Sequence, residues 1–319
     1  MKPEETKIVF MGTPEFAVPS LRSLLDAGFK VEAVVTQPDR PRGRGRRLRP
    51  SPVKELALEM GLRVLQPERA SDPLFIQEVA GMGPDFLVVA AYGQILKRPL
   101  LECARIMPVN VHGSLLPKFR GAAPIQRAIL EGEHQTGITI MEMDEGMDTG
   151  PILLMEGLKI GENETFGELH DRMAALGARL LIEALHGILT GELQPREQPK
   201  EGISYAPPIK KEELEIHWGQ SAQVIHRQIR AFDPVPGAYT TYGDDRVRLF
   251  TPRLVHGQEI EGPFVPGEII DVSNRGLTIW TGSGAILLKE VQWPGKRRMA
   301  VEAFIRGNPI PKGSLFGKA

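Results

Sequence analysis

The run Phe86-Leu87-Val88-Val89-Ala90-Ala91 decides the fold class of this chain. Every residue in it is apolar, and a strand without polar alternation is typical of a parallel sheet that helices cover on both faces. The earlier run Lys7–Gly12 has the same character and ends in the turn sequence Gly12-Thr13-Pro14. Both runs therefore predict central strands of an α/β domain.

Apolar residues at helical spacing lie between these strands and predict helices. Strands that alternate with helices predict a doubly wound α/β domain with a parallel sheet over residues 1–190. In such a sheet, ligands bind beyond the carboxyl ends of the strands, where we expect Tyr92, Gly93 and the segment at Asn110. The expected elements are helices at residues 16–25 and 52–60, and strands at residues 7–12, 31–35, around 64, 86–91 and 137–141.

The pattern changes near residue 190. Residues 191–209 are polar and poor in large apolar side chains, which is typical of a linker. Residues 210–319 then contain short strands separated by turn residues, the spacing of a small barrel. The expected elements are helices at residues 222–232 and 301–306, and strands at residues 238–242, 247–254, 267–272, 277–280 and 285–291.

The composition is that of a globular protein with two cores. The chain has 319 residues, 41% of them hydrophobic, and its 39 basic and 40 acidic residues give a net charge of -1. The single Cys103 excludes an intramolecular disulfide and makes a thiolate metal site unfavourable. We expect no signal peptide, no apolar run that spans a bilayer and no membrane partner, and hence a cytoplasmic protein. We also expect a monomer.

Asn110, His112 and Asp148 are the candidate catalytic residues. An amide, an imidazole and a carboxylate together can manage a tetrahedral intermediate at a carbonyl carbon. Asn110 and His112 are two residues apart, so on an extended segment their side chains face the same side. Each residue alone has a structural alternative, since Asn110 could cap a turn, His112 could sit in the core and Asp148 could close an Asx-turn.

A dinucleotide site must also be considered, because a glycine follows the first strand. The sequence Gly12-Thr13-Pro14-Glu15-Phe16 lacks the second and third glycines of the Rossmann fingerprint. Pro14 and Glu15 stand where a pyrophosphate would approach the backbone. NAD binding is therefore not expected.

Three segments together resemble the folate-dependent formyltransferases: residues 110–117 (NVHGSLLP), 120–125 (RGAAPI) and 144–150 (DEGMDTG). The resemblance continues through shorter matches and covers nearly the whole chain. It implies a Rossmann-like domain followed by an OB-like barrel that binds tRNA. It also implies transfer of the formyl group of 10-formyltetrahydrofolate to the α-amino group of methionyl initiator tRNA, without a metal. The shorter matches are residues 12–16, 36–41, 50–54, 91–93 and 230–232.

The resemblance also implies roles for individual residues. Asn110 and His112 would stabilise the developing oxyanion, and Asp148 would orient His112 and help move a proton. The tetrahydrofolate site would be formed by residues of three loops. These are Ser114, Leu115, Leu116, Pro117, Tyr92, Gly93 and Asp144.

A basic loop at residues 36–51 separates this sequence from formyltransferases that act on small molecules. It carries six arginines near a single acidic residue, Asp39, and its glycines and prolines predict a mobile loop. A solvated loop is the structural alternative, but arginine pairs with phosphates and stacks on exposed bases, so we expect contact with tRNA. The expected tRNA contacts are Arg40, Arg42, Arg44, Arg46 and Arg47 in this loop, and Lys296, Arg297 and Arg298 in the barrel.

Two other functions stay open from the sequence. A formyltransferase that acts on a sugar amine or a ribonucleotide would keep Asn110, His112 and Asp148 but would not need the arginine loop. A tRNA-binding protein without catalytic activity would explain the loop but not these three residues.

Overall fold

The computed structural model describes residues 2–42, 47–255 and 262–317. The chain forms two compact units, and each is described by itself. Unit 1 comprises Met1–Pro124, Thr136–Leu158 and His170–Pro207, and unit 2 comprises Ile125–Gln135, Lys159–Leu169 and Pro208–Ala319. The sequence-based boundary at residue 190 did not anticipate that two short segments of the first half group with unit 2.

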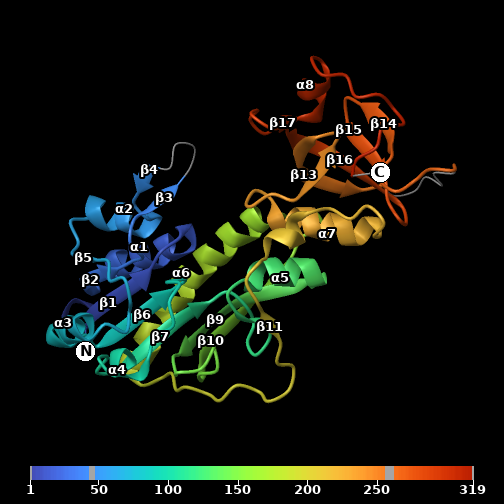
Figure 1. Ribbon diagram of the computed structural model, residues 1–319. Coiled ribbons are helices and arrows are strands. Elements are labelled where there is room, and N and C mark those ends of the chain that lie inside the picture. The colour runs from blue at the N-terminus through green and yellow to red at the C-terminus, as the bar shows by residue number, and fades with distance from the viewer. Residues whose placement is uncertain (1, 43–46, 256–261, 318–319) are drawn as a thin grey trace. The chain divides into compact units, whose positions relative to one another are not determined.

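A seven-stranded sheet with the order β10-β9-β7-β6-β1-β2-β5 forms the centre of unit 1 (Figure 1). The five strands from β7 to β5 are parallel, as predicted. β9 runs antiparallel to β7, which the sequence analysis did not foresee. The strands are β1 (Lys7–Gly12), β2 (Lys30–Val35), β5 (Val64–Leu65), β6 (Phe86–Ala90), β7 (Met107–His112), β9 (Gln135–Glu142) and β10 (Ile152–Lys159).

Helices pack on opposite faces of this sheet. One core cluster joins Val9 and Val89 of the sheet to Phe75 of α3 (Pro73–Met82) and Leu100 of α4 (Arg98–Leu101). On the other face, α6 (Phe166–Thr190) approaches so closely at Gly177 that a Cβ there would lie 2.8 Å from Val111. The remaining helices of this unit are α1 (Val18–Asp26), α2 (Pro52–Glu59) and the short 3-10 turns η1 (Pro3–Glu5) and η2 (Glu15–Ala17).

α6 is the one helix in the described part of the chain that is long and apolar enough to cross a membrane. It has 25 residues and a mean hydropathy of 1.4 over its most apolar window, of which 50% is buried inside the protein. The expectation that no apolar run reaches this length was therefore wrong. Since half of that window packs inside the protein, the burial is that of a core helix.

The flanks of the basic loop form a β-hairpin rather than an irregular loop. β3 (Arg40–Arg42) pairs antiparallel with β4 (Arg47–Arg49). Residues 43–46, which include the predicted contacts Arg44 and Arg46, lie outside the described residues. At the base of the hairpin, Asp39 accepts a hydrogen bond from Lys54 Nζ at 2.7 Å, and this contact, followed by one from Gln66, lowers the pKa of the Asp39 carboxyl.

The predicted linker packs onto unit 1. β11 (Tyr205–Ala206) pairs in parallel with β8 (Arg120–Gly121). β8 follows the NVHGSLLP segment, residues 110–117, closely in sequence. An isolated bridge also joins Arg196 to Ile152 of β10. The residues that precede Pro207 therefore belong to the structure of unit 1 rather than to a free connection.

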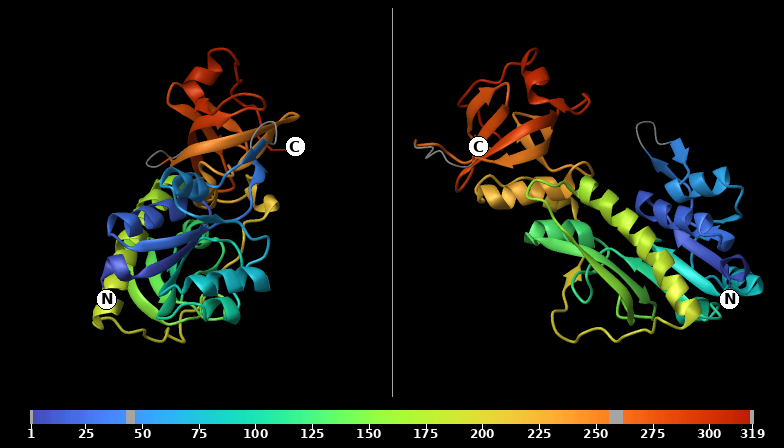
Figure 2. Two further views of the ribbon diagram at one scale, coloured as in Figure 1. Left: turned by 90° about the vertical axis from the view of Figure 1, so that its left-hand side faces the viewer. Right: turned by 180° about the vertical axis from the view of Figure 1, so that it is seen from behind.

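Unit 2 is built on an antiparallel sheet with the order β12-β13-β16-β15-β14, and β17 pairs with β16. Figure 2 shows these strands in orange to red. The five strands expected from the sequence are all present. Its strands are β12 (Tyr239–Tyr242), β13 (Asp245–Leu254), β14 (Ile269–Ser273), β15 (Gly276–Trp280), β16 (Ala285–Gln292) and β17 (Met299–Ala300). Its helices are α5 (Pro124–Glu131), η3 (Lys211–Leu214), α7 (Ala222–Phe232) and α8 (Val301–Ile305).

Candidate active site

β7 presents the first two candidate catalytic residues on one face of the sheet. Asn110 pairs with Val89 of β6 and with Met141 of β9, and His112 pairs with Thr139. Alternate residues of a strand lie on the same face, about 6.6 Å apart along the strand. Asn110 and His112 therefore both lie on the face that carries Val89, as predicted from their spacing.

His112 is buried between two oxygen atoms. Its Nε2 lies 3.1 Å from the main-chain oxygen of Phe119, and its Nδ1 lies 3.6 Å from Oδ2 of Asp148. A carbonyl oxygen can only accept, so Nε2 carries the proton in the first contact. Nδ1 then faces the carboxylate at a distance slightly too long for a hydrogen bond. A proton that arrives on Nδ1 would stand between imidazole and carboxylate.

Asp148 lies in the loop that connects β9 to β10. Its Oδ2 accepts a hydrogen bond from the main-chain N–H of Gly121 at 2.8 Å, and its side chain is 20% exposed. Its φ of 54° lies in the left-handed region, which aspartate tolerates better than most residues. The structure thus brings Asp148 to His112 from a segment that lies far along the chain.

The predicted folate residues after His112 form a tight turn. Ser114 is buried, and its hydroxyl donates to the main-chain oxygen of Lys118 at 2.6 Å. Thr139 Oγ1 donates to the Ser114 oxygen and accepts from the Leu116 N–H. Leu116 is buried too, whereas Leu115 and Pro117 are partly exposed. Ser114 and Leu116 therefore hold the turn in place, and Leu115 and Pro117 are its accessible members.

Tyr92 belongs to the core cluster of unit 1. Its side chain is only 2% exposed, and its hydroxyl has no hydrogen-bond partner among the described residues. Burial raises the pKa of Tyr92 to about 12. The main-chain oxygen of Tyr92 accepts from Thr13 Oγ1 at 2.9 Å, which ties the loops after β1 and β6 together.

A cavity of about 520 Å³ lies beside the loop that carries Asp144. Leu101, Pro108 and Met143 give it an apolar part, and the segment 144–146 borders it. The neighbouring Glu142 has a raised pKa because of burial and then the negative charges of Asp144 and Glu197. Arg98, Glu102 and Ala104 also line the cavity, and the sequence analysis named none of these three. It did name Asp144 as a folate contact.

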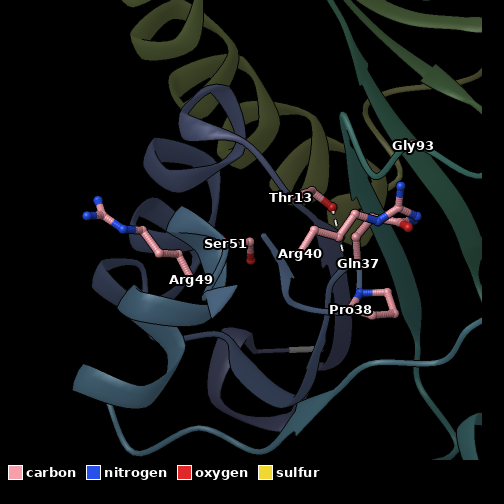
Figure 3. Close-up of a pocket in the computed structure, with 7 residues that line it drawn as sticks. All are labelled: Thr13, Gln37, Pro38, Arg40, Arg49, Ser51 and Gly93. Atoms are coloured by element: carbon pink, nitrogen blue, oxygen red, sulfur yellow. Dashed lines mark hydrogen bonds between the residues drawn. The ribbon is translucent and has the colours of Figure 1, made fainter. Parts of the chain in front are cut away.

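A second cavity of about 260 Å³ lies among the loops that follow β1, β2 and β6. Gly93 lines it, whereas Asp144 lines the 520 Å³ cavity. Arg40 and Arg49 of the hairpin are also lining residues, and Figure 3 shows Arg40 reaching toward Gln37 while Arg49 points the other way. This cavity is polar and carries positive charge.

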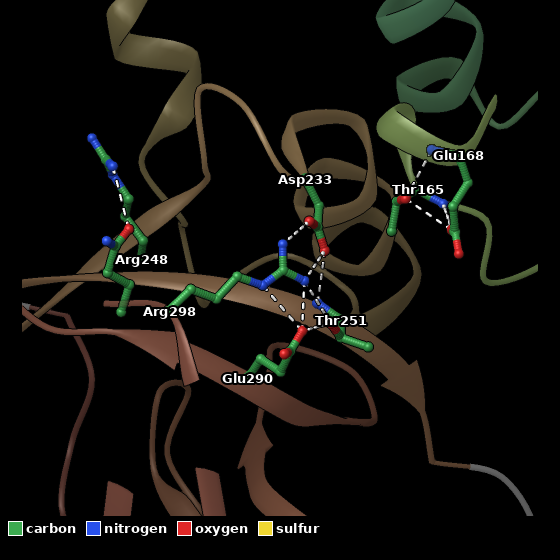
Figure 4. A network of polar contacts seen from close by, with 8 residues as sticks. Thr165, Glu168, Asp233, Arg248, Thr251, Glu290 and Arg298 are labelled. Atoms are coloured by element: carbon green, nitrogen blue, oxygen red, sulfur yellow. Dashed lines mark hydrogen bonds and ion pairs between the residues drawn. The ribbon is translucent and has the colours of Figure 1, made fainter. Parts of the chain in front are cut away.

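The remaining candidate tRNA contacts differ in their environments. Arg42 and Arg47 lie in the hairpin strands, whereas Lys296 and Arg297 are exposed in unit 2. Arg298 is engaged inside unit 2, since its guanidinium donates to Asp233 and Glu290, each at 2.6 Å (Figure 4). No cluster of metal-ligating side chains occurs among the residues that the structure describes.

Comparison with known proteins decides which family this arrangement belongs to. The formyl transferase family model matches residues 6–185, and the model of the formyl transferase C-terminal domain matches residues 208–309. A methionyl-tRNA formyltransferase of Symbiobacterium thermophilum is 47% identical over 311 residues, which is 97% of this chain and 95% of that protein. The chain belongs to the methionyl-tRNA formyltransferase family.

Other members and structures agree with this assignment. The methionyl-tRNA formyltransferase of Ruminiclostridium cellulolyticum is 46% identical over 313 residues and is covered completely. The crystal structure of WlaRD, a sugar 3N-formyl transferase, matches 92% of this chain and 99% of its own, with a TM-score of 0.65 and 20% identity. At that identity the structural match supports the fold, and the family rests on the full-length relatives.

Three residues near this site were missed from the sequence: Phe119, Gln198 and Ser204. Phe119 contacts His112 through its main-chain oxygen, so its side chain gave no chemical signal. Gln198 and Ser204 lie in the polar segment interpreted as a linker. A polar residue in a segment without periodicity gives no reason to expect it beside the active site.

Proposed function

We propose that this chain transfers the formyl group of 10-formyltetrahydrofolate to the α-amino group of methionyl initiator tRNA, with His112 and Asp148 managing the proton. The observation that supports these residue roles is the buried His112, whose Nδ1 faces Asp148 Oδ2 at 3.6 Å while Nε2 is occupied by Phe119. Near-full-length similarity to methionyl-tRNA formyltransferases supports the two substrates.

The reaction needs a proton to change place but no strong base. The α-amino nitrogen, with a reference pKa of about 7.7 to 8.0, attacks the formyl carbon and forms the new C–N bond while the carbonyl π electrons move to oxygen. Collapse of the intermediate restores the C=O bond and breaks the bond to N10 of the folate. The proton lost by the attacking nitrogen is gained by N10.

The geometry suggests a division of labour. Nδ1 of His112 is the ring nitrogen that faces Asp148, so a proton taken up there would be stabilised by the carboxylate and could be passed on. Asn110 lies on the same strand face and carries an amide N–H donor for the oxyanion. Asp148 is fixed by Gly121 and acts through His112 or directly on the leaving nitrogen.

Asp148→Asn tests these roles. The amide keeps the shape of the side chain but removes its charge, so we expect kcat to fall by about 10²- to 10⁴-fold with both substrates saturating. Asp171→Asn is the matched control, because Asp171 also lies against a histidine Nδ1, at 2.9 Å from His170, but its side chain is 83% exposed. Near-normal kcat for Asp148→Asn would remove Asp148 from the mechanism.

We propose that the 520 Å³ cavity holds the pterin ring of the folate. Its apolar lining could cover the ring, and main-chain groups of residues 144–146 could pair with the donors and acceptors of the pterin. The same loop continues to Asp148, which would bring a bound folate next to the catalytic pair. Ala104→Phe should fill the cavity and raise KM for 10-formyltetrahydrofolate at least tenfold while KM for tRNA stays constant. An unchanged folate KM would place the pterin elsewhere.

We propose that the β3–β4 hairpin and the exposed pair Lys296 and Arg297 contact the phosphates of tRNA. The hairpin supplies Arg40 and Arg49 at the polar 260 Å³ cavity, and the sequence adds Arg42, Arg44, Arg46 and Arg47. Arginine suits this task because its guanidinium pairs with phosphate and stacks on bases.

A further inference from the structure

The segment that connects the two domains touches both partners of His112. Ser204 Oγ accepts the N–H of Phe119 at 2.9 Å, and Gln198 Nε2 donates to the main-chain oxygen of Asp148 at 2.8 Å. Phe119 and Asp148 are in turn the two residues whose oxygen atoms flank the imidazole. Residues 198–206 therefore contact both residues that flank His112: Ser204 contacts Phe119, and Gln198 contacts Asp148.

Both partners of His112 have an unfavourable backbone conformation. Phe119 has a φ of 59° and Asp148 a φ of 54°, values that residues other than glycine rarely adopt. Such conformations persist only where the surrounding structure holds them, and they concentrate at functional sites. The hydrogen bonds from the connecting segment are contacts that can hold them.

Gln198 makes the larger set of these contacts. Its amide nitrogen donates to the main-chain oxygens of Asp148 and Gly150, each at 2.8 Å. Its amide oxygen accepts from Arg120 Nη2 at 2.6 Å and from Arg120 Nε at 3.2 Å. Arg120 is 7% exposed, so the glutamine is itself fixed by a buried group.

The same element reaches Asp148 by a second route. Gly121, which follows Arg120 in β8, donates its N–H to the Asp148 carboxylate at 2.8 Å. Arg120 thus orients Gln198 on the main chain of Asp148, while its neighbour binds the side chain. Asp148 is thus held at its main-chain oxygen and at its carboxylate, and Gln198 joins Arg120 of β8 to the loop of Asp148.

We infer that Gln198 is a positioning residue for formyl transfer. It holds the Asp148 loop so that the carboxylate stays opposite Nδ1 of His112, and it contacts neither substrate. The inference rests on the proposed roles of His112 and Asp148. A small displacement of a reacting group can lower a rate by about 10²-fold, so loss of this contact should be visible in kcat.

Two substitutions separate the contacts of Gln198. Gln198→Met keeps the length of the side chain but removes donor and acceptor. Gln198→Glu keeps the size of the side chain and the acceptor for Arg120, but it sets a carboxylate oxygen, in place of the N–H donors, against the main-chain oxygens of Asp148 and Gly150. Both should lower kcat about 10- to 100-fold with less than threefold change in KM for folate and tRNA. Gln194→Met, at an exposed glutamine of the same segment, is the matched control.

A combined variant tests whether Gln198 acts through Asp148. Residues that act as a unit are strongly non-additive, so Gln198→Met should change the kcat of Asp148→Asn less than twofold. If Gln198→Met leaves kcat normal, or lowers it by the same factor with and without Asp148→Asn, the inference is overturned. Near-normal kcat for Asp148→Asn alone would instead refute the proposed catalytic role, which is a separate outcome.

Discussion

Gly121 is the residue at which the connecting segment and the catalytic loop meet. Its φ is 123°, and a Cβ added there would lie 2.8 Å from the main-chain oxygen of Ala206. Gly121→Ala should therefore lower the free energy of unfolding by about 1–3 kcal/mol and lower kcat, because the N–H that binds Asp148 would move. Chemical denaturation and steady-state kinetics on the same preparation measure both effects.

Gly191 supplies the control for this substitution. Its φ of 77° is also unfavourable for alanine, but a Cβ there meets nothing within 4 Å. Gly191→Ala thus carries the conformational cost alone and should leave kcat unchanged. Equal losses of stability in the two variants would show that the contact with Ala206 has no effect.

Tyr92 offers a prediction on pH. Its buried hydroxyl lacks a partner among the described residues, so Tyr92→Phe should raise the free energy of unfolding by about 1 kcal/mol at neutral pH. The folded state favours the neutral phenol, with a pKa of about 12. The preference of the folded state for the neutral phenol stabilises the fold fully below pH about 10, the ordinary pKa of tyrosine. This stabilisation is lost as pH rises toward 12, because the unfolded chain then loses the phenol proton.

The advantage of Tyr92→Phe should accordingly grow between pH 10 and 12. Denaturation curves across this range measure it, with Tyr205→Phe as control because Tyr205 is 62% exposed. A difference that stays constant with pH would contradict the burial argument. A raised KM for folate in Tyr92→Phe would instead assign the hydroxyl to the folate site.

At this scale, the sequence indicated candidates whose chemistry is in the side chain. Asn110, His112 and Asp148 stand out because amide, imidazole and carboxylate are reactive groups in a matching motif. Phe119 acts through its carbonyl, which every residue possesses, so nothing in its identity indicates the role. Gln198 acts across 50 residues of sequence, a separation that only the fold bridges.

Among the elements, the strands of the apolar core were the most predictable. Residues 86–91 predicted β6 because both faces of that strand are buried. β10 lies at the sheet edge with Leu153 as its one buried residue, and its short apolar run Ile152–Met155 breaks off at Glu156, so the sequence carries no sustained strand pattern there. The antiparallel direction of β9 was not predictable either, because apolar pattern carries no information on strand direction.

Arg298 belongs to the basic cluster Lys296-Arg297-Arg298 of the sequence, but in the structure it forms ion pairs within unit 2. Its guanidinium pairs with Asp233, which is 2% exposed, and with Glu290 of β16. Arg298→Met would leave Asp233 buried without its cation, and we expect a loss of about 3 kcal/mol in the stability of unit 2. Thermal unfolding checks this, with Arg297→Met as the exposed control. An unchanged melting temperature for Arg298→Met would contradict the structural role.

For the whole molecule, the family match and the compact units place the main division at nearly the same point. The two family models are separated by residues 186–207, and unit 2 takes up the chain again at Pro208. Sequence patterns could locate this change in character because a parallel α/β sheet and short antiparallel strands differ in periodicity. They could not show that residues 198–206 pack on the catalytic loops, since those contacts are polar and non-local.

Binding of tRNA should depend on salt through both proposed surfaces. Each arginine that neutralises a phosphate contributes roughly one unit to the slope of log K against log salt concentration. Arg40→Ala with Arg49→Ala should weaken tRNA binding and reduce that slope, and Lys296→Ala with Arg297→Ala should do the same independently. Folate KM is the internal control for both. A slope equal to that of the unchanged protein would exclude phosphate contact by the altered pair.

Formyl transfer to a panel of amines is the most direct test of the account. The protein is supplied with 10-formyltetrahydrofolate and, separately, with methionyl initiator tRNA, methionyl elongator tRNA and sugar amines. We predict formylation of methionyl initiator tRNA, little reaction with the elongator and none with the sugars. Formylation of a sugar amine without formylation of methionyl initiator tRNA would contradict the proposed function.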